Sequence, residues 1–260
     1  MSHEKPAGPA PAARGHARAA GLSSSSARGA DLVEARQHAT DPGRKRPIRD
    51  SARLTVALNP LPRSFYARPV LTVARDVIGK LLVHVTPGGV LAARIVESEA
   101  YRGPEDRAAH SWGGRRTERT EVMFGPPGFA YVFFVYGMHW HLNLVTTREG
   151  SPHAVLLRAV EPISGGAQMA RRRKLTADDV RLSNGPGKLC QAFGIDRRHY
   201  GVDLTAGSLF LSDAPAARGK LGRSPRIGVD YAGAWAEKPW RFFEQNNRWV
   251  SRVRPPRQQP

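Results

Sequence analysis

The stretch that decides the fold is RIVESEAY, residues 94–101, which RGPEDRAAHS continues at 102–111. Side chains alternate between two faces along an extended segment, so we expect Glu97, Glu99 and Tyr101 on one face. Two carboxylates and a phenol on one face of a short strand suit the wall of a polar cavity better than a core. Residues 94–143 are therefore interpreted as an active-site segment.

The second half of this segment predicts a hairpin with an aromatic first strand. YVFFVYG at 131–137 leads into HWHLN at 139–143, and the tip consists of Tyr136, Gly137 and Met138. An exposed tyrosine beside a glycine at a hairpin tip suits a wedge between stacked bases. Packing of Tyr136 beneath its own turn remains the alternative.

Charge and length limit the class of protein. The 260 residues carry a formal net charge of +18, which favours a polyanionic partner because Lys and Arg displace counterions from phosphates. An arginine-rich composition without such a partner is the alternative. The single cysteine, Cys190, excludes an intramolecular disulfide. Without an apolar run of 18 residues or a secretory signal, the chain is expected inside the cell, cytoplasmic or in the nucleoid if bacterial and nuclear if eukaryotic.

Composition predicts one folded domain with tails. Residues 1–58 are rich in Ala, Pro, Gly, Ser and Arg and poor in aromatic residues, so a basic disordered tail is expected there. The domain is expected at 59–252, and residues 253–260 are expected to fray.

Several segments on either side of residues 94–143 have residue patterns that predict helices or strands. Apolar residues recur every three or four positions from residue 69 to 79, which predicts a core helix, and 81–85 and 90–96 read as the strands of a hairpin. A strand at 155–157 would present Arg158, a basic helix is expected at 165–174, and 209–211 reads as a strand. NGPGK at 184–188 precedes a helix at 189–193, where backbone amides and Lys188 suit a phosphate; helix capping alone would also explain these glycines.

A metal site is the main alternative that the residues of the 94–143 segment suggest. Glu97, Glu99, Asp106 and His110 are oxygen and nitrogen donors, but no ligand spacing of known strength such as HExxH is present. We predict neither a metal nor a cofactor. A metal-dependent nuclease that uses the three carboxylates stays as a hypothesis.

Long motifs resemble one family, the alkyladenine (3-methyladenine) DNA glycosylases. The resemblance covers residues 60–252 and rests on RIVESEAYRGPEDRAAHS at 94–111, Met123-Phe124, YVFFVYGMHWHLN at 131–143, VLLRAVEP at 155–162, NGPGKLCQAFGI at 184–195, RIGV at 226–229 and KPWRF at 238–242. It implies one α/β domain of the α+β type, with a curved, mostly antiparallel sheet packed with helices. It also implies a monomer that acts on double-stranded DNA without a cofactor.

The resemblance further implies a reaction. Family members flip alkylated or deaminated purines, of the 3-methyladenine, 7-methylguanine and hypoxanthine class, out of the duplex. They hydrolyse the N-glycosidic bond and leave an abasic site without cutting the strand. By motif position Glu99 would be the general base that activates water. The other implied roles are base-pocket walls (Tyr101, His110, Phe133), exclusion of normal guanine (Asn143), intercalation (Tyr136) and DNA contacts (Arg115, Arg158).

Two departures and one alternative remain. Relatives often carry tyrosine where this chain has Phe133, so a hydroxyl is lost while the stacking face is kept. The spacing between Asn143 and Arg158 is slightly longer than in relatives. A non-catalytic nucleic-acid-binding module of the same fold is the alternative to the enzyme.

Overall fold

The computed structural model describes residues 58–135, 137–214 and 219–252. The predicted basic tail, except for its last residue, and the C-terminal segment 253–260 lie outside the described residues, as does Tyr136.

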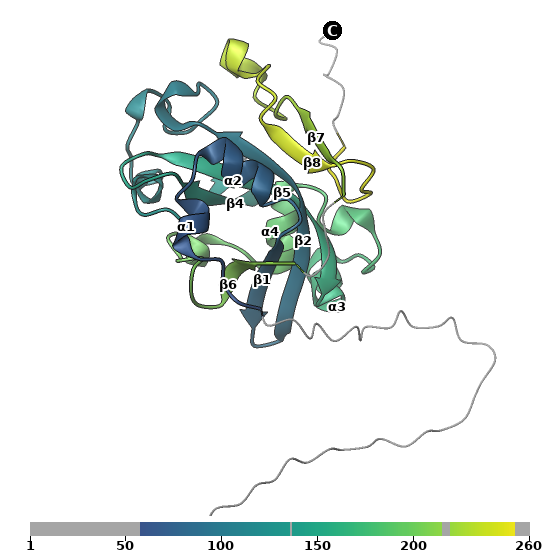
Figure 1. Ribbon diagram of the computed structural model, residues 1–260. Coiled ribbons are helices and arrows are strands. Elements are labelled where there is room, and N and C mark those ends of the chain that lie inside the picture. The colour runs from purple at the N-terminus through teal and green to yellow at the C-terminus, as the bar shows by residue number, and fades with distance from the viewer. Residues whose placement is uncertain (1–57, 136, 215–218, 253–260) are drawn as a thin grey trace, which may run out of the picture. The chain divides into compact units, whose positions relative to one another are not determined.

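An eight-stranded sheet organises the described residues (Figure 1). Its main path runs β3-β4-β5-β2-β1-β6, and β8 pairs with both β2 and β7. All pairings between these strands are antiparallel, and the sheet curves around the α-helices, so the predicted α+β class is confirmed. The strands are β1 (Leu81–Thr86), β2 (Gly89–Tyr101), β3 (Ala130–Val135), β4 (His139–Thr146), β5 (His153–Ser164), β6 (Leu209–Ser212), β7 (Leu221–Ser224) and β8 (Arg241–Glu244).

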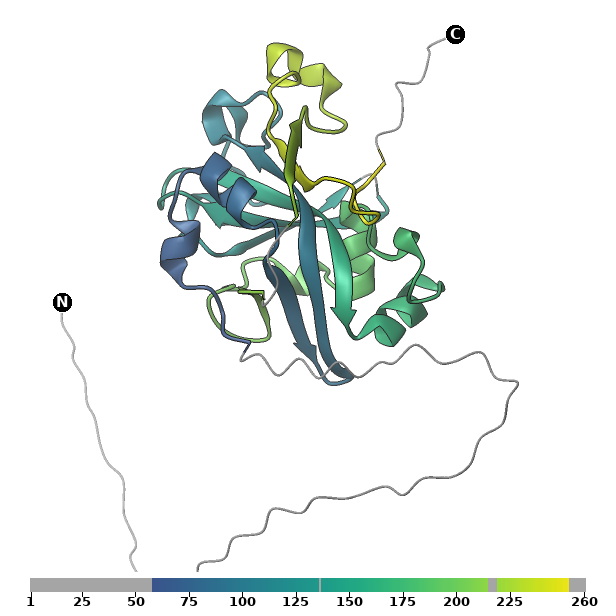
Figure 2. The same cartoon turned by 45° about the vertical axis from the view of Figure 1, so that its right-hand side comes forward.

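The long strand β2 is the centre of the sheet. On one side it pairs with β5 along most of its length. On the other side its first half forms a hairpin with β1, and residues 97–99 pair with β8. Figure 2 shows the dark blue strands of this hairpin running side by side. RIVESEAY thus lies where three strands meet.

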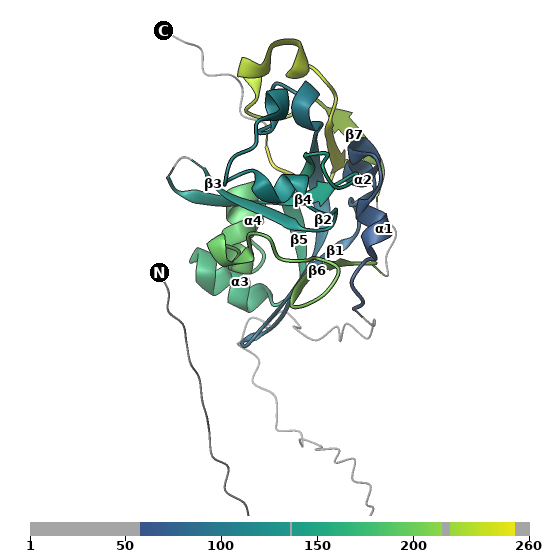
Figure 3. The same cartoon turned by 90° about the vertical axis from the view of Figure 1, so that its left-hand side faces the viewer.

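Helices cover both faces of the sheet. The α-helices are α1 (Arg63–Tyr66), α2 (Val70–Asp76), α3 (Gly166–Arg173) and α4 (Pro186–Phe193). Figure 3 shows α1 and α2 on one side of the sheet and α3 and α4 on the other. Short 3-10 helices occupy the connections: η1 (Gly103–Glu105), η2 (Trp112–Gly114), η3 (Glu121–Phe124), η4 (Val180–Leu182), η5 (Arg197–His199) and η6 (Asp230–Trp235).

Apolar periodicity explains how these helices attach. In α2, Val70, Val73 and Ala74 are buried, and Pro69 precedes its first turn. The helix ends at Asp76, three residues before Gly79, where the sequence placed its end. In α4, Gly187 allows the helix to approach β4, because a Cβ at this glycine would lie 2.8 Å from Cβ of His139. No helix of the described residues is long and apolar enough to span a bilayer.

Candidate active site

The register of the sheet places the predicted site residues in rows. Tyr131 pairs with Asn143, Asn143 pairs with Leu156, and Leu156 pairs with Glu99, so one row crosses β3, β4, β5 and β2. Residues that pair directly across neighbouring strands point to the same face. Phe133 pairs with His141 one step along the same face. Local alternation and strand pairing together therefore assemble the site.

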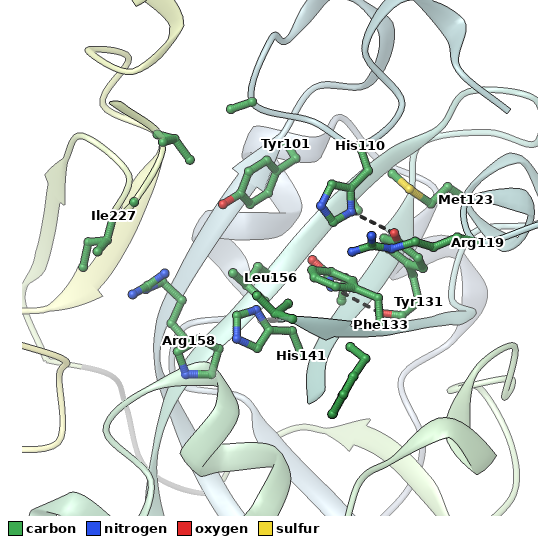
Figure 4. Close-up of a pocket in the computed structure, with 18 of the residues that line it drawn as sticks. Tyr101, His110, Arg119, Met123, Tyr131, Phe133, His141, Leu156, Arg158 and Ile227 are labelled. Carbon is green, nitrogen blue, oxygen red and sulfur yellow. Dashed lines mark hydrogen bonds between the residues drawn. The ribbon is translucent and has the colours of Figure 1, made fainter. Parts of the chain in front are cut away.

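A cavity of about 510 Å³ lies on this face. This volume is typical of a small-molecule site. Figure 4 shows the rings of Tyr101, His110 and Phe133 directed toward a common space. The lining residues are Tyr101, Ala108, His110, Arg119, Met123, Tyr131, Phe133, Phe134, Val135, His141, Asn143, Ala154, Leu156, Arg158, Pro186, Ile227, Gly228, Val229 and Tyr231.

The carboxylate of Glu99 is buried directly behind this lining. Its Oε2 accepts hydrogen bonds from the Tyr101 hydroxyl at 2.9 Å and from Nη1 of Arg158 at 3.1 Å. Its Oε1 accepts one from the backbone N–H of Ile227 at 2.8 Å. All three donor residues line the cavity. A carboxylate has about four acceptor positions, so these three donors leave one position for a further donor such as water.

Glu97 has a different environment from Glu99, although both contact Arg158. It accepts from Nε of Arg158, Nε of Arg241, and both the backbone N–H and the hydroxyl of Ser251, at 2.7 to 2.9 Å. Burial would raise the pKa of Glu97, but Arg158 and Arg241 outweigh burial and hold this pKa below its usual value. Neither Glu97 nor Glu99 is among the residues that line the cavity, so of the three residues predicted to form one polar wall only Tyr101 does.

A β-bulge in β2 accompanies the different environments of Glu97 and Glu99. The pairing of β2 with β5 shifts register between Ile95 and Glu97 and again between Glu97 and Ser98. A β-bulge bends the strand and redirects its side chains. Glu97 thereby faces Arg241 of β8 and Ser251, while Glu99 stays beside the cavity.

Arg158 joins the two carboxylates and faces the cavity. Its side chain is 9% exposed. Burial would lower the pKa of the guanidinium, but Glu99 and Glu97 raise it, so Arg158 stays charged. The sequence predicted a strand at 155–157 with Arg158 at its end, but β5 runs from His153 to Ser164, so Arg158 lies within the strand.

Tyr101 packs against Arg226, which forms a buried ion pair with Asp106. The guanidinium carbon of Arg226 lies 4.7 Å from the centroid of the Tyr101 ring. Arg226 donates to both carboxylate oxygens of Asp106, at 2.5 and 2.9 Å, and to the carbonyl of Ala100 at 2.9 Å. Burial raises the pKa of Tyr101 well above its usual value, so the hydroxyl donates to Glu99.

His110 and Phe133 form the opposite wall with Tyr131. Nδ1 of His110 lies 2.8 Å from the Tyr131 hydroxyl, and the centroids of the His110 and Phe133 rings are 4.5 Å apart. Burial of part of the imidazole, together with the charges of Arg119 and Arg115, lowers the pKa of His110 to about 4. The wall is therefore neutral and aromatic near pH 7.

Asn143 lines the cavity and is buried, and its Nδ2 donates to the carbonyl of Tyr131 at 3.2 Å. Arg115 and Lys188 do not line the cavity. Arg115 is exposed on the loop after η2, and Nζ of Lys188 donates to Oδ1 of Asn184 at 2.7 Å. Tyr136 lies outside the described residues, but its neighbour Met138 is 69% exposed.

Sequence reasoning missed three groups that shape this site. Ile227 supplies a backbone donor to Glu99, Arg226 packs behind Tyr101, and Arg119 places its guanidinium 5.0 Å from the centroid of the Phe133 ring. RIGV had been recognised as a motif without a role for its backbone.

The carboxylates that could have formed a metal site are held by arginines. Arg158 pairs with Glu97 and Glu99, and Arg226 pairs with Asp106. Within the described residues, no group of three or more His, Cys, Asp or Glu side chains is placed to hold an ion.

Comparison with known proteins agrees with this geometry. The family model described as methylpurine-DNA glycosylase matches residues 64–248. The chain belongs to the methylpurine-DNA glycosylase family. Three relatives carry the name "Putative 3-methyladenine DNA glycosylase". That of Desulfitobacterium hafniense is 48% identical over 74% of this chain and 98% of its own length. That of Methanocella arvoryzae is 50% identical over 75% and 97%, and that of Bacillus cereus is 45% identical over 74% and 98%.

Family membership confirms the resemblance found in the motifs and supports a role as a DNA glycosylase acting in base excision repair. The cavity, the aromatic walls and the buried carboxylate lie within the matched residues.

Proposed function

We propose that this protein is a monofunctional DNA glycosylase that releases alkylated or deaminated purines from double-stranded DNA. It acts as a monomer through the domain at 59–252, flips the damaged nucleotide into the cavity and leaves an abasic site. The observation that carries the proposal is the buried Glu99 carboxylate, which adjoins an aromatic cavity and accepts three hydrogen bonds from residues that line it.

Glu99 is the proposed general base. A water molecule in the remaining acceptor position gives its proton to Glu99 as its oxygen bonds to C1′ of the flipped sugar. The bond between C1′ and the purine nitrogen breaks, and its electron pair leaves with the base. The same carboxylate stabilises the positive charge that develops on the sugar. Arg158 and the N–H of Ile227 orient Glu99 through their hydrogen bonds.

Tyr101, His110 and Phe133 are the proposed walls for the flipped base. An N3- or N7-alkylated purine is cationic, so it is attracted to aromatic faces and leaves as a neutral molecule. The neutral imidazole of His110 adds no charge that would repel it. Asn143, which lines the cavity, is proposed to crowd the 2-amino group of normal guanine.

The contacts to DNA outside the cavity are proposed from the resemblance and from charge. Tyr136 would fill the space that the flipped nucleotide vacates. Arg115 and Lys188 would contact backbone phosphates, and Arg158 would approach the flipped nucleotide from the cavity side. Strand cleavage by a lyase step needs an amine nucleophile, and no lysine is among the described residues that line the cavity.

One assay tests the reaction and its rivals. Duplexes with a single hypoxanthine, and separately methylated duplex DNA, are incubated in EDTA with wild type and Glu99→Gln. Released base is measured directly, and strand breaks are scored before and after alkali. The expected result is release by wild type with breaks after alkali only, and a rate about 100- to 10,000-fold lower for Glu99→Gln.

Glu105→Gln is the matched control, because Glu105 is exposed at η1 and its side chain is 56% accessible. It should leave the rate unchanged. Binding without release on either substrate would leave the non-catalytic module. Strand breaks before alkali that disappear in EDTA would favour the nuclease.

A further inference from the structure

His141 is a pocket residue to which neither the motifs nor the mechanism assigns a role. It lies on β4 directly opposite Phe133, and the two ring centroids are 5.5 Å apart. Figure 4 shows its ring between Arg158 and Phe133 at the cavity. It therefore shares the cavity with the walls proposed to hold the base.

The ring nitrogens of His141 differ from those of His110 and His84. Nδ1 of His110 bonds to the Tyr131 hydroxyl at 2.8 Å, and Nδ1 of His84 to the Phe193 carbonyl at 2.9 Å. Among the residues that the structure describes, the His141 ring makes ring contacts and electrostatic interactions but no hydrogen bond. A half-buried polar group without a partner is costly. A molecule bound in the cavity can supply that partner.

The surroundings of His141 keep the ring neutral. Burial is the largest cause, and the charge of Arg158 and the nearby His139 and His110 add to it, lowering the pKa of His141 to about 4. A neutral imidazole has one N–H donor and one acceptor nitrogen. It can pair with an oxygen or ring nitrogen of a base, or accept from an N–H, and it does not repel a cationic base.

We propose that His141 is a specificity-determining residue that hydrogen-bonds the polar edge of the flipped purine and thereby favours neutral, deaminated purines. This inference rests on the proposed glycosylase function. A cationic purine gains attraction from the aromatic walls through its charge. Hypoxanthine lacks that charge, so its hold in the cavity depends more on hydrogen bonds to its carbonyl oxygen and ring nitrogens. Phe133 offers a stacking face to both kinds of base, whereas His141 offers a polar edge.

The test compares two variants on two classes of lesion. His141→Phe keeps an aromatic ring and removes both polar nitrogens, and His141→Gln restores a donor and an acceptor. Single-turnover release of hypoxanthine is measured beside release of 3-methyladenine and 7-methylguanine from methylated duplex DNA. We expect His141→Phe to lower hypoxanthine release about 10-fold, the size of one neutral hydrogen bond, with the methylated bases changed less than about 3-fold. His141→Gln should recover part of the loss.

His139→Gln is the control, because His139 lies on β4 outside the cavity lining. It should leave the ratio of the two rates unchanged. Equal losses on both lesion classes, or an unchanged ratio in His141→Phe, would overturn the inference and leave the glycosylase function standing. Release of methylated bases but not hypoxanthine by wild type would also overturn it. Release of neither by wild type would refute the proposed function itself.

Discussion

The buried ion pair between Asp106 and Arg226 connects three segments of the site. Both side chains are 0% exposed. Arg226 also donates to the carbonyls of Ala100 and Trp235, at 2.9 and 3.0 Å. Asp106 further accepts from the backbone N–H of Ala108 at 3.0 Å. The end of β2, the loop that carries His110 and the segment that carries Ile227 are thus joined at one point.

We predict that Asp106→Asn lowers the free energy of unfolding by about 3 kcal/mol, because removing one partner of a buried ion pair leaves the other charge uncompensated. The variant keeps the volume but only one oxygen, so either the N–H of Arg102 or the N–H of Ala108 loses its acceptor together with one nitrogen of Arg226, in addition to the loss of charge. For a domain of this size each kcal/mol shifts the melting temperature by about 2–4 °C, which gives a decrease of about 6–12 °C. The rate of base release should also fall, because Ile227 follows Arg226 directly.

Equilibrium urea unfolding provides the measurement, with Glu121→Gln as the comparison. Glu121 also forms a two-point pair with an arginine, Arg116, but these side chains are 56% and 59% exposed. Exposed pairs contribute little because water screens them, so the midpoint should not change measurably. An Asp106→Asn midpoint that moves no more than that of Glu121→Gln would refute the argument from burial.

Three further predictions concern Arg158, His141 and Gly187. Arg158→Met should lower the free energy of unfolding by about 3 kcal/mol and slow base release, since Glu99 loses its charged partner; urea unfolding and single-turnover rates check this. His141 has a pKa of about 4 in the folded protein against 6.5 ordinarily, so the unfolded chain binds more protons between these values. Stability should therefore fall by up to about 3 kcal/mol as pH drops from 6.5 to 4, and His141→Phe should flatten that part of the urea-midpoint profile. Gly187→Ala should lower the free energy of unfolding by about 1–3 kcal/mol, although alanine has a better helix propensity than glycine, because the new Cβ would lie 2.8 Å from Cβ and Cγ of His139. Thermal unfolding measures the net effect.

The elements with local patterns could be predicted from the sequence. Alternation located the hairpins of β1 with β2 and of β3 with β4, and three- and four-residue spacing located α2. The strands β7 and β8 were missed. Each has four residues, and β8 is defined by its pairing with residues 97–99 of β2, more than 140 positions earlier. A period cannot be read from so short a segment.

Some residues of the site could likewise be predicted from the sequence, and others could not. Tyr101, His110, Phe133, Asn143 and Arg158 line one cavity, and the roles that the resemblance implies for them stay predictions. The donor from Ile227 to Glu99 spans 128 positions, and a backbone N–H has no signature in the sequence. Arg119 lies in a loop of several arginines, and only its distance to Phe133 distinguishes it.

Strand alternation does not distinguish Glu97 from Glu99, because they lie two residues apart on the same strand, and in the sequence only the resemblance to the family motif assigns the general base to Glu99. Among the described residues, Glu97 accepts four hydrogen bonds and Glu99 accepts three. A carboxylate has about four acceptor positions, but three of the four donors to Glu97 share its Oε1, and two of the donor residues, Arg241 and Ser251, do not line the cavity. Glu99 has one position left and is surrounded by three residues that line the cavity. The position of the donors, which for Glu97 include Ser251 and Arg241 from the far end of the chain and for Glu99 all line the cavity, thus favours Glu99 as the one that binds a nucleophilic water.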